Sequence, residues 1–178
     1  VLPELEKMDR ARVRQLFATQ QHREFPSAIA MLLLASNTAN ADLKAITERW
    51  KLSNEEVRIV TAVLRNAPKL AIAHKIAWSK IQPILIDRDV RYVLDVAVEI
   101  AAADRLGEDG IRRVNEALNQ PTEVLDPAPL LNGSDLAKLE IPAGPVYAKI
   151  LRHLRQRQLD GELSTREQAI AEVRATRW

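Results

Sequence analysis

The chain has 178 residues, of which 47% are hydrophobic and 28% charged, and its formal net charge is +2 at pH 7. This length fits one ordinary domain or a main domain with a small appendage, and the composition is that of a globular chain rather than a disordered one. The lack of Cys excludes disulfides, thiol catalysis and Cys-ligated zinc, and the lack of a run of roughly 20 apolar residues argues against a membrane helix and favours a cytoplasmic protein.

The N-terminal part of the chain has the apolar spacing of consecutive helices. Aromatic residues make up only 4% of the chain, which favours helices over strands. Ser53 and Glu56 have the spacing of a capping box, in which the serine accepts a backbone N–H and the glutamate reaches back. The helix after them is expected to stop near Pro68, and 70–86 lacks a regular period. Further helices are expected at 4–20, 27–36, 41–50, from Asp87 or Arg88 onward, and at 107–120.

Asp87 and Asp89 have the spacing of a metal-binding carboxylate pair and follow the apolar, strand-like run 84–86. On a strand, such a pair can share a divalent ion for phosphoryl transfer. At a helix start, Asp87 would instead be the cap and Asp89 would lie in the first turn, where the dipole favours negative charge. We favour the helix start, with Glu99 on the solvent side of that helix. The sequence therefore has no visible catalytic centre and no metal site.

The segment 121–129 interrupts the helical pattern. It has three prolines in nine residues and no helical period, so it is the expected domain boundary. We expect a helical body at 1–120, a linker at 121–129 and a helical tail at 130–178. No stretch alternates convincingly, so the predicted fold is all-α, a multi-helix bundle with a small helical tail module.

Glycine and proline mark the expected helix ends of the tail. A tight turn at Gly133 leads into the first helix, with Ser134 or Asp135 as its cap. A second capping box is expected at 164–167. The expected tail helices are 134–139, 145–159 and 165–174.

The start of the second tail helix is a candidate anion site. Gly144 leaves the first backbone N–H groups uncovered beside Pro145, and in RNA the anion for such a site is phosphate. Basic side chains are expected on the solvent side of this helix, which Gly161 ends. From the residues alone, a plainer alternative stays open. In it, the glycines and prolines only mark the helix ends of a bundle, and the basic residues only face solvent. The candidate phosphate-binding residues are Lys138, Gly144, Val146, Lys149, Arg152 and Arg155, and the structural positions are Gly133, Asp135, Pro145 and Gly161.

Three tail segments carry a resemblance to a known family. They are L-x-G-x-D-L from Leu131, G-P-x-x-x-x-I-L from Gly144, and a Gln-Leu-Asp-Gly turn at 158–161 followed by a Thr-Arg-Glu helix. Together they resemble the C-terminal module of bacterial class II tRNA nucleotidyltransferases, the family of CCA-adding enzymes and poly(A) polymerases. The distinctive similarity covers 130–174, and weaker similarity lies at 50–57.

The resemblance implies an order of head, neck, body and tail in a longer parent chain. It implies that a separate N-terminal head holds Mg²⁺ and ATP or CTP and adds nucleotides, so that this chain has no cofactor and no transfer activity of its own. It also implies that the helical parts hold the acceptor arm and T-loop of tRNA by their backbone phosphates. The expected partners are therefore tRNA and that head.

Two positions depart from the family's pattern. Glu140 stands where the family usually has Gly, and Ala148 stands where a second helix Gly is common. Both departures weaken the expectation of a close backbone approach there. Another function class stays open, namely a structural or protein-interaction domain without RNA binding. A helix-turn-helix DNA binder at 54–65 is the weaker alternative, because its outward residues are not basic enough for a DNA groove.

Overall fold

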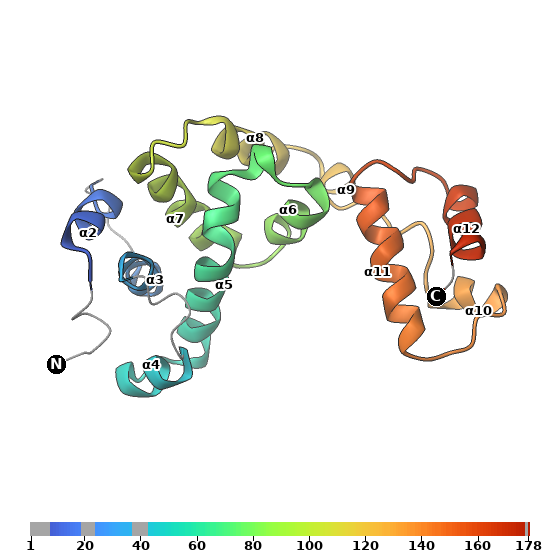
Figure 1. Cartoon of the computed structure of the whole chain (residues 1–178), viewed down its shortest axis with the longest axis horizontal. Helices are drawn as coiled ribbons and strands as arrows, with labels where there is room; N and C mark the ends of the chain where they lie inside the picture. Colours follow the sequence, from blue (N-terminus) through green and yellow to red (C-terminus); the bar gives the residue numbers. More distant parts are fainter. Residues whose placement is uncertain (1–7, 19–23, 37–42, 177) are drawn as a thin grey trace. The chain divides into compact units, whose positions relative to one another are not determined.

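The computed structural model describes residues 8–18, 24–36, 43–176 and 178. In this part of the chain the helices α2 to α12 and one short 3-10 helix, η1, follow one another without any strand (Figure 1). The predicted all-α fold is therefore confirmed. Among the described helices, none combines the length and the apolar composition needed to cross a bilayer. The chain divides into two compact units.

The first unit comprises Val1–Ile76 and Asp87–Leu118 and is organised around α5. This helix packs against α3 and α7, and α2 contacts both of these (Figure 1). The core consists of aliphatic side chains from these helices, such as Ile29, Met31, Leu33, Ile59, Val63 and Val96. The helices of this unit are α2 (Arg10–Leu16), α3 (Phe25–Ala35), α4 (Leu43–Trp50), α5 (Asn54–Ala71), η1 (Ala73–Lys75), α7 (Val90–Ala103) and α8 (Asp109–Leu118).

Local sequence chemistry accounts for two helix starts of this unit. Ser53 Oγ accepts the N–H of Glu56 at 3.2 Å, and Glu56 Oε2 accepts the N–H of Ser53 at 2.7 Å, so the predicted capping box is confirmed. The backbone hydrogen bond from Ser53, followed by the one from its hydroxyl, lowers the pKa of the Glu56 carboxyl. Pro26 lies in the first turn of α3, where its missing N–H breaks no helical hydrogen bond. The outer parts of the helices predicted at 4–20 and 41–50 lie outside the described residues.

Two prolines lie inside helices. The prediction that the helix after Ser53 stops near Pro68 is wrong, because α5 continues to Ala71. The prediction of an irregular stretch at 70–86 is also wrong, because it contains η1 and α6 (Trp78–Leu85), with Pro83 inside α6 and the run 84–86 at its end. Both prolines are exposed, so water can replace the hydrogen bond that each ring removes.

Asp89 is a buried residue with a specific partner. Its carboxylate forms an ion pair with the guanidinium of Arg58 in α5 and is shielded from solvent. A helix does follow, as predicted, but its predicted start at Asp87 or Arg88 is too early, since α7 begins at Val90 with Asp89 before its first turn. The predicted cap is also wrong, because no side chain caps this helix. Asp87 Oδ1 accepts the N–H of Asp89 at 2.9 Å instead. Glu99 was expected on the solvent side but is 3% exposed, because several helices surround α7.

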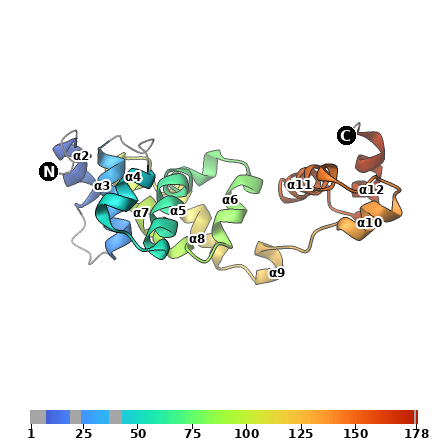
Figure 2. The same cartoon turned by 90° about the horizontal axis from the view of Figure 1, so that it is seen from below.

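The second unit comprises Ala77–Ile86 and Asn119–Trp178. Within it, α11 contacts α6, α10 and α12, and Figure 2 shows α10, α11 and α12 as one group. The segment 121–129 was predicted to contain no helix. This prediction is wrong, because the segment contains the short helix α9. The limits 1–120, 121–129 and 130–178 stay a prediction. The helices of this unit are α6, α9 (Thr122–Leu125), α10 (Gly133–Lys138), α11 (Pro145–Leu159) and α12 (Arg166–Ala175).

The three tail helices lie within one residue of their predicted limits and share a small core. Burying each large aliphatic side chain in such a core contributes about 1.5–3 kcal/mol before the entropy cost of folding. One side of α11 is therefore fixed against this core, and its other sides remain for contacts with residues 126–129 and for solvent. The buried core residues are Leu131, Leu136, Ile150, Leu154, Leu163, Ala169 and Val173.

Candidate functional site

Asn132 caps α10. Its Oδ1 accepts the N–H groups of Ser134 at 2.9 Å and Asp135 at 3.2 Å, and Asp135 Oδ2 accepts the N–H of Asn132 at 2.9 Å. The prediction that Ser134 or Asp135 is the cap is wrong, because both lie inside the helix. Gly133 is the first helical residue and has no positive φ, so the tight glycine turn predicted there is not formed.

Arg166 joins the start of α12 to the start of α10. Its Nη2 donates to Asp135 Oδ1 at 2.5 Å, and its Nη1 donates to the Leu130 carbonyl at 3.5 Å. The hydrogen bond from Arg166, together with the backbone hydrogen bond from Asn132, lowers the pKa of the buried Asp135 carboxyl to about 2. The aspartate of the L-x-G-x-D-L segment therefore holds two helices together.

The second capping box lies one residue further along than predicted. Thr165 Oγ1 accepts the N–H of Gln168 at 3.2 Å, and Gln168 Oε1 accepts the N–H of Thr165 at 3.2 Å. The prediction of a box at 164–167 is therefore wrong by one position. The extended backbone of Thr165, with φ −126° and ψ 158°, makes this residue the N-cap.

Glycines stand at both ends of α11. Gly144 has a φ of 156° and leaves the helix without a side-chain cap, and Pro145 is the first helical residue. Gly161 has a φ of 79° and directly follows the C-cap. There the N–H of Glu162 donates to the Arg157 carbonyl at 2.8 Å, which satisfies a carbonyl of the last turn. Both ends therefore have the backbone features predicted from the sequence, while the anion site at Gly144 stays a prediction.

Glu140 also has a left-handed backbone, with φ 59°. It follows the C-cap of α10, and the N–H of Ile141 donates across it to the Leu136 carbonyl at 3.2 Å. This is the helix end at which glycine is preferred, because a side chain strains that conformation. The departure at Glu140 therefore concerns backbone strain just after the end of α10. Ala148, the other departure, is an exposed residue of α11.

The candidate phosphate-binding residues are divided between α10 and α11. Lys138 is exposed in the last turn of α10. Lys149 and Arg152 are exposed on α11 and, three residues apart, lie on the same side of that helix. Within the described part of the chain, neither forms an ion pair. Gly144 and Val146 place their amides at the helix start, while the Val146 side chain packs against the tail core.

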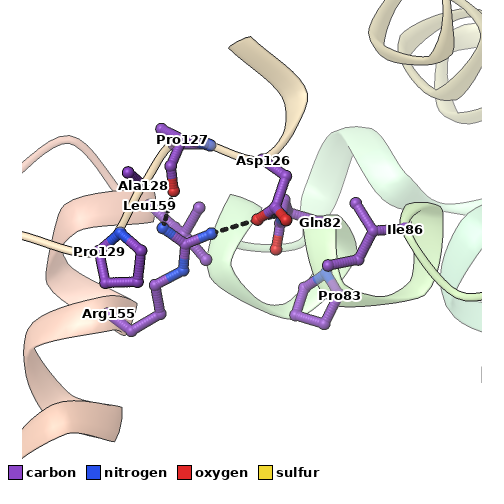
Figure 3. Close-up of a pocket in the computed structure, with 9 residues that line it drawn as sticks. All are labelled: Gln82, Pro83, Ile86, Asp126, Pro127, Ala128, Pro129, Arg155 and Leu159. Atoms are coloured by element: carbon purple, nitrogen blue, oxygen red, sulfur yellow. Dashed lines mark hydrogen bonds and ion pairs between the residues drawn. The ribbon is translucent and has the colours of Figure 1, made fainter. Parts of the chain in front are cut away.

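Arg155 is not on the solvent-facing side of α11. Its side chain is 24% exposed, and its Nη2 donates to Asp126 Oδ1 at 2.5 Å while its Nη1 donates to the Pro127 carbonyl at 2.5 Å (Figure 3). The predicted exposed position is therefore wrong, because a segment distant in sequence supplies acceptors for this guanidinium. We call this segment, residues 126–129, the strap.

The strap is fastened to α6 as well as to α11. Gln82 of α6 is buried, and its Nε2 donates to Asp126 Oδ1 at 2.9 Å and to the Leu125 carbonyl at 3.1 Å. Gln158 of α11 donates to the Ala128 carbonyl at 2.8 Å. The pocket of about 400 Å³ beside the strap is lined by the side chains of Gln82, Asp126 and Arg155 and by Pro83, Ile86 and Leu159 (Figure 3). Its polar side chains are thus already paired with one another.

A second link between α6 and α11 lies at Ser79. The N–H of this residue donates to Asp160 Oδ1 at 2.8 Å, and its hydroxyl donates to Asp160 Oδ2 at 2.7 Å. The first turn of α6 is thereby held to the C-terminal end of α11.

Sequence reasoning missed Gln82, Asp126, Asp160 and Arg166. The first three gave no local signal, because the partners of each are far away in the sequence. Arg166 did give one, since a cation in the first turn of a helix opposes the helix dipole. Such a residue indicates a specific acidic partner, which the structure identifies as Asp135.

Comparison with known proteins gives a family. A family model described as tRNA nucleotidyltransferase domain 2, putative, matches residues 20–173. No curated protein and no solved structure matches the chain. The matched residues include helices of both compact units, from α3 to most of α12.

Proposed function

The chain belongs to the tRNA nucleotidyltransferase domain 2 family, and from this we propose that it is a tRNA-binding helical region that holds the RNA by its backbone phosphates. The observation that carries the proposal is the pair Lys149 and Arg152, which are exposed on one side of α11 and form no ion pair within the described chain. Cationic side chains of this kind fix the position of a nucleic acid without reading its sequence.

The start of α11 adds to this pair. The amides of Gly144 and Val146 lie at a helix N-terminus without a side-chain cap, where the helix dipole favours an anion. Lys138, exposed at the end of α10, adds a further cation from the same compact unit. We omit Arg155 from the proposed contacts, because the strap already occupies both ends of its guanidinium.

We assign nucleotide addition to a separate N-terminal head of a longer parent chain. Among the described residues no group of three His, Asp or Glu side chains could hold a metal ion. Binding of Mg²⁺ and of ATP or CTP is therefore proposed for that head, where metal ions would stabilise the phosphoryl-transfer charge. The chain by itself is expected to add no nucleotide to tRNA.

The experiment is a titration of tRNA binding against salt concentration. Each neutralised phosphate contributes roughly 0.7 to 0.9 to the slope of log affinity against log salt. The double variant Lys149→Glu and Arg152→Glu should bind tRNA more weakly, with a slope smaller by about 1.4 to 1.8. Circular dichroism should be unchanged, because both positions are exposed.

The control is the double variant Arg65→Glu and Arg88→Glu, which reverses two exposed arginines of the first unit. If the control weakens binding as much as the tail variant does, contact with RNA is diffuse and the tail site is refuted. If the wild-type chain binds no tRNA even at low salt, a structural or protein-interaction domain becomes the better interpretation.

A further inference from the structure

A groove runs between α11 and residues 129–133, which lead into α10. Its volume is about 390 Å³, within the range of small-ligand pockets in proteins. One wall is formed by Pro129, Leu130 and Leu131, and the other by Leu151 and Leu154 of α11. Both walls belong to the same compact unit, and the leucines pack against the tail core, so the groove has a fixed apolar lining.

The charged groups of the groove are all positive. Arg152 and Arg155 line it, and no Asp or Glu does. The guanidinium of Arg155 is engaged by the strap, whereas Arg152 is exposed and forms no ion pair within the described chain. The groove is therefore complementary to a ligand with an apolar body and one adjacent negative charge.

Two polar side chains of the lining are already engaged. Asn132 Oδ1 accepts hydrogen bonds from the N–H and the hydroxyl of Ser134 and from the N–H of Asp135. Gln158 donates to the Ala128 carbonyl through Nε2 and accepts from Arg155 through Oε1. The groove therefore offers its ligand mainly apolar surface, which suits a flat face.

We propose that this groove takes the base of one unstacked nucleotide of the bound RNA, with the adjoining phosphate on Arg152. Unpaired RNA presents bases whose faces are free to pack in this way, and contact through the face does not discriminate between bases. This inference rests on the proposed function and deepens it, because it adds a base contact to a surface otherwise expected to bind phosphates alone.

The test compares two single-stranded probes of equal length and charge, an oligouridylate and a ribose-phosphate chain without bases, by fluorescence anisotropy with the full chain. If the groove holds a base, the oligouridylate binds measurably more tightly than the chain without bases, and both probes give the same salt slope. Equal affinities with a clear salt slope would overturn the base contact and leave phosphate binding intact. If neither probe binds at low salt, the groove and the proposed function fail together.

Two matched variants locate the effect. Leu151 and Ile170 are both half-buried beside the tail core, but only Leu151 lines the groove. Leu151→Gln should remove the difference between the two probes, and Ile170→Gln should keep it. Loss of the difference in both variants would place the base contact elsewhere and overturn the assignment. The comparison of probes on the wild-type chain decides the question even if one variant fails to fold.

Discussion

Arg166 Nη2 lies 2.5 Å from Asp135 Oδ1, so one ion pair connects the first turns of α12 and α10. Asp135 at the same time completes the capping box of Asn132. The carboxylate thus serves two helices, and its protonation should loosen both.

We predict that this contact makes the tail sensitive to acid. The pKa of Asp135 is about 2 in the folded chain and roughly 3.9 in an unfolded one. A lowered pKa means that the carboxylate stabilises the fold fully above about pH 4 and that this stabilisation is lost as the pH falls towards 2. Thermal unfolding measured from pH 6 to pH 2 should therefore show a smaller drop for Asp135→Asn than for the wild type. The control Asp109→Asn removes the exposed ion pair between Asp109 and Arg112, and its thermal unfolding should depend on pH as that of the wild type does.

We predict that the strap resists proteases only while Arg155 holds it. Arg155→Leu removes the donors to Asp126 and Pro127 and leaves a half-buried carbonyl without its partner, which costs about 1–3 kcal/mol of unfolding free energy. Limited proteolysis should cut 126–129 in this variant first and urea unfolding should shift to lower concentration. Arg112→Leu, which removes an exposed pair with Asp109, should do neither. Rapid cleavage of the strap in the wild-type chain would contradict the prediction that the hydrogen bonds from Arg155 protect it.

Gly110 should tolerate no side chain. A Cβ at this position of α8 would lie 2.3 Å from the carbonyl oxygen of Ala71, a backbone atom at the end of α5. We expect Gly110→Ala to lower the unfolding free energy by about 1–3 kcal/mol or more, because α8 must move away from that carbonyl. Gly133→Ala is the matched control, since its Cβ would meet nothing closer than 3.9 Å. If Gly110→Ala lowered the unfolding free energy in urea no more than Gly133→Ala does, α8 would be able to move away from the Ala71 carbonyl without cost, which would contradict the prediction.

Glycine at position 140 should stabilise the tail. Glu140 has a φ of 59°, a conformation that costs a residue with a side chain roughly 1–2 kcal/mol. Glu140→Gly relieves this strain but adds entropy to the unfolded chain, so we expect a net gain of about 0.5–1 kcal/mol in urea unfolding. Glu140→Ala keeps the Cβ and should leave stability nearly unchanged. A gain of the same size from alanine would point to the charge of Glu140 instead of its backbone.

The sequence predicted those features of the tail that depend on neighbouring residues. Gly144, Pro145 and Gly161 set the ends of α11 through their own backbone preferences, so reading them locally was sufficient. Pro68 misled the same reasoning, because a proline on an exposed side of a helix is tolerated when packing holds the remainder. The prediction that Arg155 is exposed was wrong for a different reason. Whether a basic side chain is free or paired depends on a segment distant in sequence, which periodicity does not reveal.

The order of the two units along the chain has a consequence for synthesis on the ribosome. The chain enters the second unit at Ala77, leaves it after Ile86 and returns at Asn119. The first unit is complete at Leu118 and can fold while the tail is still being translated. During that time α6 lacks its packing partner α11, which has not yet emerged. A nascent chain that stalls before α11 would therefore keep α6 without this partner, and incompletely packed segments of this kind are the ones that chaperones bind.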